Sequence, residues 1–279
     1  MSSDLPIGVF DSGMGGLTVL AALMERLPDE DMIYLGDTAR LPYGTKSPRT
    51  VARYAAQAAA KLVEQKIKLL VIACNTASAT ALDDLRAAWP ELPVLGVVEP
   101  GARAACAATR NGSIAVIATE STIRNGAYQA AIHKINPQAR VAAQACSLFV
   151  PLAEEGWMEG PIVEAVARRY LAPVFPAETA RTPDGRMPEC LVLGCTHFPP
   201  LAGALRAILG EEIKIVDSAA TTAAAAAEAL DGRGLRSGRN LGQGKTRFMT
   251  TDDEVRFARI GSLFLGRPLE AGQVELINL

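Results

Sequence analysis

The feature that most constrains the fold is an alternation of short apolar runs with longer helix-like stretches. We expect β-strands at 6–13, 31–37, 69–74 and 94–100, and again at 112–119, 139–146, 189–195 and 212–219. We expect helices at 17–26, 47–66, 78–89, 122–135, 161–175 and 221–230. A β–α–β–α order is typical of a parallel sheet with helices on both faces. The sequence therefore predicts an α/β protein.

The chain is long enough for two such units. It has 279 residues, which is long for one domain and suits two lobes. Hydrophobic residues make up 49% of the chain, enough to form an ample core. The alternation restarts at the strand expected over 112–119. We therefore expect two similar α/β lobes with mainly parallel sheets and a ligand site in the cleft between them.

Charge and hydropathy argue against several functional classes. The formal net charge is only −2, whereas binding nucleic acid requires a clustered basic surface. The longest strongly apolar run, residues 69–74, is too short to span a bilayer, and the N-terminus does not resemble a signal peptide. The five cysteines are an odd number, so we expect reduced thiols and a cytoplasmic protein.

Two similar phrases each place a cysteine at the end of an expected strand. Cys74 lies in "VIACNTASAT" and Cys195 lies in "LVLGCTHFPP". Open α/β sheets bind ligands at this end of their strands. Backbone N–H groups and the helix dipole should lower the thiol pKa there and favour thiolate. Hydrogen-bonding residues follow each cysteine, which favours a reactive pair over packing: Asn75, Thr76, Thr196 and His197.

The other three cysteines, Cys106, Cys146 and Cys190, fit a packing role. A zinc site built from Cys190, Cys195 and His197 is an alternative. However, this spacing on a strand points alternate side chains to opposite faces, and no second pair supplies the remaining ligand. We therefore expect no metal site.

A glycine-rich turn, "VFDSGMGGLTVL", follows the first expected strand. With Asp37 at the end of the second strand, it imitates a dinucleotide-binding fingerprint. The third glycine of that fingerprint is missing, and the Asp11 carboxylate would repel a pyrophosphate. A carboxylate here better suits a ligand ammonium or the tuning of a nearby acid or base. A simple turn role for Asp11 stays open.

Two further stretches become informative only in combination with the rest. "GDTARLPYGTKS" reads as a turn that carries Tyr43 and Gly44. "LFVPLAEEGWMEG" places Glu154 on a loop or at the start of a helix. The Pro-rich and polar stretch 176–189 reads as an exposed connection.

Together these phrases resemble the glutamate racemase family of the aspartate/glutamate racemase superfamily. The segments that carry the resemblance span almost the whole chain: DSGMGGLTV, GDTARLPYG, CNTASA, GVVEPGA, PLAEEG, LGCTHFPPL and VDSA. The resemblance implies cofactor-independent interconversion of L- and D-glutamate, which supplies D-glutamate for bacterial peptidoglycan. Inversion at Cα needs a base on one face of the substrate and an acid on the other, and two thiols can supply both.

The resemblance also implies roles for individual residues. Cys74 would deprotonate the D-enantiomer with help from Asp11, and Cys195 would deprotonate the L-enantiomer. His197 and Glu154 would support Cys195, and Asp37 is a further catalytic candidate. The expected substrate-binding residues are mostly small polar groups: Asp11, Ser12, Tyr43, Gly44, Asn75, Thr76, Thr119, Thr122, Thr196 and His197.

The family layout implies a first lobe of residues 1–98 joined by 217–279, with a second lobe of residues 99–216. We expect a homodimer, a small-molecule substrate, no cofactor, and no nucleic-acid or membrane partner. The alternatives are racemization of aspartate, a hydantoin or another small acid by the same thiols, a binding or regulatory protein, and a nucleotide-binding dehydrogenase. DSGMGGLTV and GCTHFPPL favour the glutamate branch.

Overall fold

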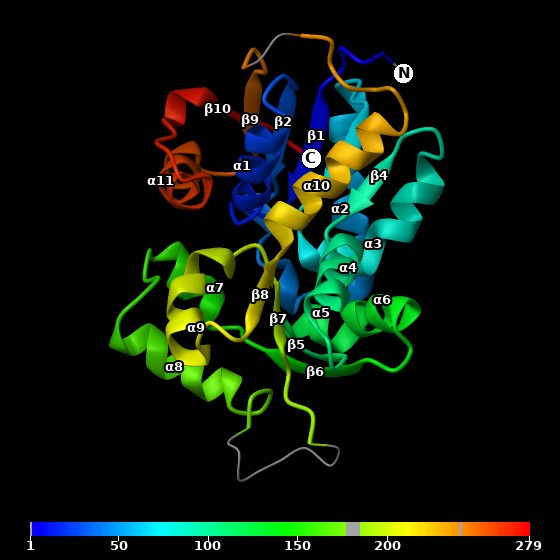
Figure 1. Ribbon diagram of the computed structural model, residues 1–279. Helices are drawn as coiled ribbons and strands as arrows, with labels where there is room; N and C mark the ends of the chain where they lie inside the picture. Colours follow the sequence, from blue (N-terminus) through cyan, green and yellow to red (C-terminus); the bar gives the residue numbers. More distant parts are fainter. Residues whose placement is uncertain (1, 177–184, 240–241) are drawn as a thin grey trace.

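The computed structural model describes residues 2–176, 185–239 and 242–279. Its strands form two separate sheets, and every strand pairing in this part of the chain is parallel. The six-stranded sheet and its helices occupy the upper part of Figure 1, and the four-stranded sheet occupies the lower part. The predicted α/β class with two lobes and parallel sheets is confirmed.

The first sheet has the strand order β10-β9-β2-β1-β3-β4. Its strands are β1 (Ile7–Asp11), β2 (Met32–Gly36), β3 (Leu69–Ile72), β4 (Val94–Gly96), β9 (Thr246–Thr250) and β10 (Val274–Leu276). The helices whose buried side chains belong to its cores are α1 (Leu17–Arg26), α2 (Pro48–Glu64), α3 (Asn75–Ala88), α10 (Ser218–Asp231) and α11 (Glu254–Leu265). Strands from both ends of the chain therefore share this sheet.

The second sheet has the strand order β6-β5-β7-β8. Its strands are β5 (Ser113–Ala118), β6 (Arg140–Ala145), β7 (Cys190–Gly194) and β8 (Lys214–Asp217). The helices of this half are α4 (Val98–Ala108), α5 (Glu120–Asn125), α6 (Ala127–Ile135), α7 (Phe149–Glu154), α8 (Pro161–Leu171) and α9 (Ala202–Leu209). Most of the expected connection at 176–189 lies outside the described residues.

Each sheet has a hydrophobic core on both of its faces. In β1, Val9 packs into one core and the next residue, Phe10, packs into the other. In β5 of the second sheet, Val116 packs into the core on one face and Ile117 packs into the core on the other face. Successive side chains of a strand point to opposite faces, so a strand that is covered on both faces is continuously apolar. This burial explains the short apolar runs in the sequence.

Several helix boundaries differ from the expected ones. The helix expected over 122–135 is broken at Gly126, which adopts a left-handed conformation (φ 73°) between α5 and α6. Helix α10 begins at Ser218, three residues before the expected start, and its N-cap is Asp217, whose carboxylate accepts from Ala219 and Ala220 N–H. Ser47 caps α2, with Pro48 at the first helical position.

The carboxyl ends of four central strands carry the residues of interest. β1 ends at Asp11, and Cys74 follows β3 and caps the N-terminus of α3. Thr119 directly follows β5, and Cys195 directly follows β7. The two sheets therefore bring the ends of their central strands to one region between the halves, which is where α/β sheets bind ligands.

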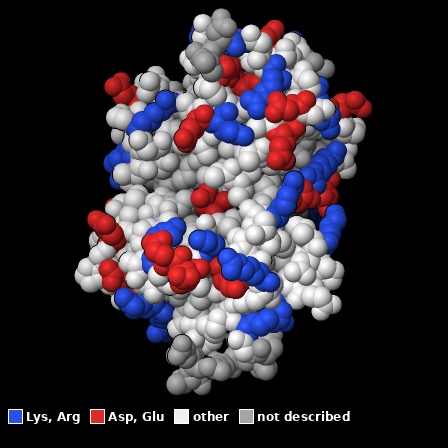
Figure 2. Space-filling model, viewed as in Figure 1, with Lys and Arg blue, Asp and Glu red and all other residues white. Residues whose placement is uncertain are grey.

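Among the described residues, no helix combines the length and apolar character needed to cross a bilayer. Acidic and basic side chains are interspersed over the face of the molecule shown in Figure 2.

Candidate active site

A cavity of about 160 Å³ lies between the two halves, and both Cys74 and Cys195 line it. This volume is smaller than the roughly 300–1,000 Å³ of sites for drug-sized ligands, so it suits a small metabolite. Eleven predicted site residues line the cavity: Ser12, Tyr43, Gly44, Cys74, Asn75, Thr76, Thr119, Glu154, Cys195, Thr196 and His197. Three do not line it: Asp11, Asp37 and Thr122.

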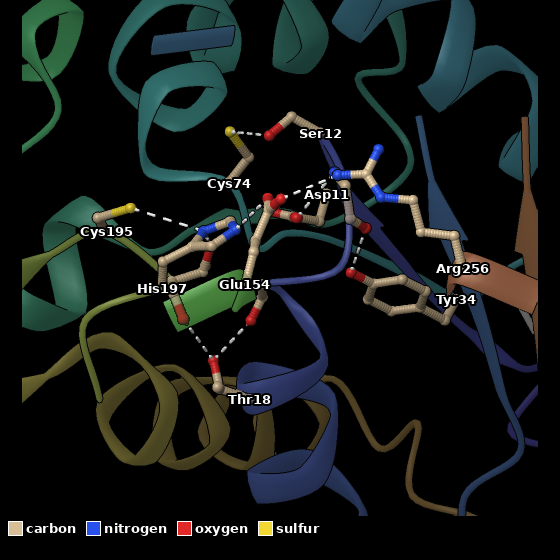
Figure 3. Close-up of polar contacts among 12 residues, drawn as sticks. Asp11, Ser12, Thr18, Tyr34, Cys74, Glu154, Cys195, His197 and Arg256 are labelled. Carbon is tan, nitrogen blue, oxygen red and sulfur yellow. Dashed lines mark hydrogen bonds and ion pairs between the residues drawn. The ribbon is translucent and has the colours of Figure 1, made fainter. Parts of the chain in front are cut away.

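Cys74 sits between a strand and a helix and is 5% exposed. Its Sγ donates to Ser12 Oγ and accepts from Ala77 N–H, both at 3.4 Å (Figure 3 shows the first contact). Burial and the nearby Asp11 charge raise the pKa of Cys74 to about 12. The expectation that the helix terminus would lower this pKa is wrong, because desolvation outweighs the two hydrogen bonds. Cys74 is therefore a neutral thiol.

Cys195 belongs to a chain of polar contacts (Figure 3). Its Sγ lies 3.9 Å from His197 Nδ1, and His197 Nε2 lies 3.2 Å from Glu154 Oε1. The other oxygen of Glu154 lies 3.2 Å from Arg256 Nη2 on α11. Glu154 is the last residue of α7, so its expected place on a loop or at a helix start is corrected. The chain thus joins α7 and β7 of one half to α11 of the other.

His197 is held as an imidazolium. Burial of the ring opposes protonation, but the hydrogen bonds to Cys195 and Glu154, together with the charges of Cys195 and Asp11, outweigh it. They raise the pKa of His197 to about 10. The imidazolium places a positive charge beside the Cys195 sulfur. The desolvation of Glu154 is likewise outweighed by His197 and Arg256, which lower the pKa of this carboxyl group.

The pKa of His197 can be tested directly by NMR. The chain has only two histidines, so a His133→Asn variant assigns the signals of His197. We expect His197 to stay protonated until the pH approaches about 10. An unfolded histidine titrates near 6.5, so the stabilisation from this proton is full below about pH 6.5 and is lost as the pH rises through 10. Titration of His197 near pH 6.5 in the folded protein would contradict this account.

Asp11 lies behind the cavity and is completely buried. Its Oδ2 accepts from Gly13 N–H at 2.9 Å, while Oδ1 has no hydrogen-bond partner among the described residues. Burial raises the pKa of this carboxyl group, and the charge of His197 and the backbone N–H groups of the turn only partly offset the rise. The Asp11 charge acts on both Cys74 and His197. It therefore influences both thiol-bearing segments through electrostatics.

Asp37 also lies outside the cavity lining, and it holds a residue that does line it. Its carboxylate accepts from the hydroxyl group of Tyr43, from Arg40 Nε and from Thr251 Oγ1. Tyr43 is 1% exposed and belongs to the cavity wall. Asp37 therefore holds Tyr43 in the cavity wall through this hydrogen bond and does not itself line the cavity.

Three threonine hydroxyl groups form a closed set of contacts across the two halves. Thr76 Oγ1 lies 3.0 Å from Thr119 Oγ1 and 3.3 Å from Thr122 Oγ1. Thr119 and Thr122 are themselves 3.0 Å apart. Thr122 is 1% exposed, so it supports the two lining residues from behind.

The three cysteines expected to serve packing do not line the cavity. Cys190 packs in the core on one face of the second sheet, and Cys195 lies in the core on the opposite face. Cys146 is fully buried and Cys106 is half-buried against a core. All five cysteines are free thiols. The side chains of Cys190 and Cys195 therefore point to opposite faces of the sheet, and this arrangement argues against a zinc site that includes both.

The sequence did not predict several residues at the site, and three of them contact its predicted residues. Gly15 packs so closely on His197 that a Cβ atom there would lie 2.5 Å from its Nδ1. The glycine-rich turn in the sequence could have indicated Gly15, because the absence of a side chain there allows the turn to pack closely against His197. Arg256 and Tyr128 reach the site from helices distant in the sequence, and no local pattern marks them.

Comparisons with known proteins agree with this geometry. The family model described as Asp/Glu/Hydantoin racemase matches residues 14–226. The chain is 50% identical to the glutamate racemase of Geobacter metallireducens over 98% of this chain and 96% of that protein.

Solved structures show the same fold. The glutamate racemase of Francisella tularensis in complex with D-glutamate matches with a TM-score of 0.88 and 38% identity, over 99% of this chain and 98% of that one. The glutamate racemase of Thermus thermophilus in complex with β-chloro-D-alanine matches with a TM-score of 0.86 and 41% identity, over 100% and 99%. The chain therefore belongs to the glutamate racemase family, within the Asp/Glu/hydantoin racemases.

Proposed function

We propose that this protein interconverts L- and D-glutamate by a two-base mechanism that needs no cofactor. The observation that carries the proposal is that Cys74 and Cys195, from the strand ends of two different sheets, line one small cavity. Racemization requires a proton to leave Cα on one face and a proton to arrive on the other. Two sulfur atoms contributed by opposite halves are suited to that task.

The pKa of Cys74 suits this residue to act as the acid when L-glutamate is the substrate. Cys195, with the His197 imidazolium beside it, would act as the base and remove the Cα proton of L-glutamate. Cys74, whose pKa is raised to about 12, would deliver its thiol proton to the opposite face and give D-glutamate. In the reverse direction Cys74 must act as the base. The ammonium group of bound D-glutamate supplies a positive charge that would lower the pKa of Cys74.

Neutral donors account for the binding of the substrate carboxylates. The cavity lining contains no lysine or arginine among the described residues, but it has the hydroxyl groups of Thr76, Thr119 and Thr196. The N-terminus of the 14-residue helix α3 also opens here. Backbone N–H groups at a helix start bind anions. Donors fixed in a buried site can also stabilise the charge that develops on the carboxylate as the Cα proton leaves.

We further propose the cellular context and assembly that the family suggests. The protein would act in the cytoplasm as a homodimer and supply D-glutamate for peptidoglycan synthesis. Residues 1–98 with 217–279 would move as one lobe and residues 99–216 as the other, because each set contains one sheet, apart from Asp217, the last residue of β8. A change in the angle between these lobes would open the cavity.

The decisive experiment is incubation of the pure protein with L-glutamate in deuterated water. We expect deuterium at Cα of the D-glutamate formed, together with loss of optical rotation. A parallel incubation with L-aspartate tests the sister activity. No exchange and no change in rotation with glutamate would overturn the proposal.

A further inference from the structure

The side chain of Tyr128 is packed between the two thiol-bearing segments of the protein. Tyr128 lies on α6 and is 1% exposed. A Cβ atom on Gly194 would lie 2.9 Å from Tyr128 Cε2, and one on Gly101 would lie 3.2 Å from Cε1. A side chain at position 194 would therefore force the ring to shift, and one at position 101 would crowd it. Gly194 directly precedes Cys195, so the ring packs against the backbone next to the Cys195 thiol.

The hydroxyl group of Tyr128 reaches the residue beside the other thiol. It donates to Asn75 Oδ1 at 2.7 Å, and Asn75 directly follows Cys74. Ser218 Oγ lies 3.4 Å from the same oxygen, but its single proton has a closer acceptor in Leu193 O at 3.1 Å. Burial raises the pKa of Tyr128, so its phenol stays protonated and remains a donor. The Tyr128 hydroxyl group is thus the main donor to the oxygen end of the Asn75 amide.

The nitrogen end of the same amide is free. Asn75 is 3% exposed and lines the cavity, and its Nδ2 has no hydrogen-bond partner among the described residues. The two orientations of an amide have the same shape, so hydrogen bonding decides between them. The reversed orientation would leave the buried Tyr128 O–H without its acceptor, which is unfavourable.

We propose that Tyr128 is a positioning residue that holds the Asn75 amide with its N–H groups available to the substrate. An amide held this way donates to a carboxylate oxygen and repels an ammonium group. Tyr128 thereby selects which end of an amino acid binds beside Cys74. This inference rests on the proposed function, because it takes an amino acid as the ligand of the cavity.

Tyr128→Phe tests this role, since it removes the hydroxyl group and keeps the ring between Gly101 and Gly194. We expect KM for both enantiomers to rise about 3- to 10-fold with little change in kcat, the effect of losing one hydrogen bond. Tyr170→Phe is the matched control, because among the described residues its hydroxyl group makes one hydrogen bond, accepted from Leu148 N–H away from the cavity. Unchanged KM in Tyr128→Phe would overturn the proposal.

A double-mutant cycle with Asn75→Ala separates positioning from general destabilisation. If Tyr128 acts through Asn75, then Tyr128→Phe should have no further effect on KM in the Asn75→Ala background. Equal effects in both backgrounds would show that Tyr128 acts independently, against the proposal. Lack of racemase activity in the unmodified protein would instead refute the proposed function.

NMR gives a readout that does not depend on turnover. The side-chain N–H signals of Asn75 are assigned by their loss in Asn75→Ala. In the unmodified protein we expect glutamate to shift these signals, and in Tyr128→Phe we expect a smaller shift at equal occupancy. Equal shifts in the two proteins would contradict the positioning role.

Discussion

Cys74→Ala and Cys195→Ala should each lower glutamate racemization by roughly 10³-fold or more in both directions. A positioned acid or base contributes about 10² to 10⁴ in rate, and each direction of the proposed reaction uses one thiol as base and the other as acid. Loss of either sulfur therefore removes one of the two proton transfers from every turnover. Circular dichroism of L- and of D-glutamate solutions measures both directions.

Cys106→Ala is the matched control for these variants. Cys106 is half-buried at the edge of a core and does not line the cavity, so its truncation should leave the rate near that of the unmodified protein. Residual exchange in deuterated water should depend on the enantiomer, with Cys74→Ala exchanging only L-glutamate and Cys195→Ala only D-glutamate. Full activity in either active-site variant would refute the two-base mechanism.

Gly15→Ala should lower the rate by about 100-fold or more, although it adds only one methyl group. The new Cβ atom would lie 2.5 Å from His197 Nδ1 and 2.5 Å from Thr196 Oγ1. Neither side chain is at the free end of a flexible stem, so the turn or the segment after Cys195 must shift. A displacement of about 1 Å at a catalytic group can cost about 10²-fold in rate. Overpacking should also cost roughly 1–3 kcal/mol of unfolding free energy.

Gly203→Ala is the control for Gly15→Ala, because it replaces a glycine with alanine without creating a steric clash. Gly203 lies in α9, and a Cβ atom there would meet no atom within 4 Å. This variant should keep full activity and gain about 0.4–1 kcal/mol of stability, because alanine restricts the unfolded chain. Urea denaturation and initial rates measure both quantities. If Gly15→Ala behaved like Gly203→Ala, the close packing against His197 would have no functional importance.

The fold could be predicted from the sequence largely because its strands are buried on both faces. The apolar runs around Val9 and Val116 mark such strands without any knowledge of their partners. Helix α4 was not predicted, because it begins only two residues after β4 and contains Pro100 and Gly101 in its first turns. The break at Gly126 was missed because the helical pattern continues on both sides of it.

The site was predictable where its residues stand at strand ends and unpredictable where it depends on packing. Cys74 and Cys195 could be found because each ends an apolar run. The direction of the pKa shift of Cys74 could not, because it depends on burial and on a charge from another strand. Arg256 likewise contacts Glu154 across 102 positions of sequence.

The three threonine hydroxyl groups that bridge the halves have a consequence for a site that must hold mirror-image ligands. Each hydroxyl group of Thr76, Thr119 and Thr122 can donate or accept, so the cycle of bonds can run in either rotational sense. Reversing it requires only rotation of hydrogen atoms, with no movement of the backbone. The intact cycle uses all three protons, but a ligand carboxylate can take the proton of Thr76 or of Thr119 by rotation of that one hydroxyl group, while the other two groups keep a bond between them. A lysine or arginine in the same place would fix one polarity and could favour one hand of the ligand.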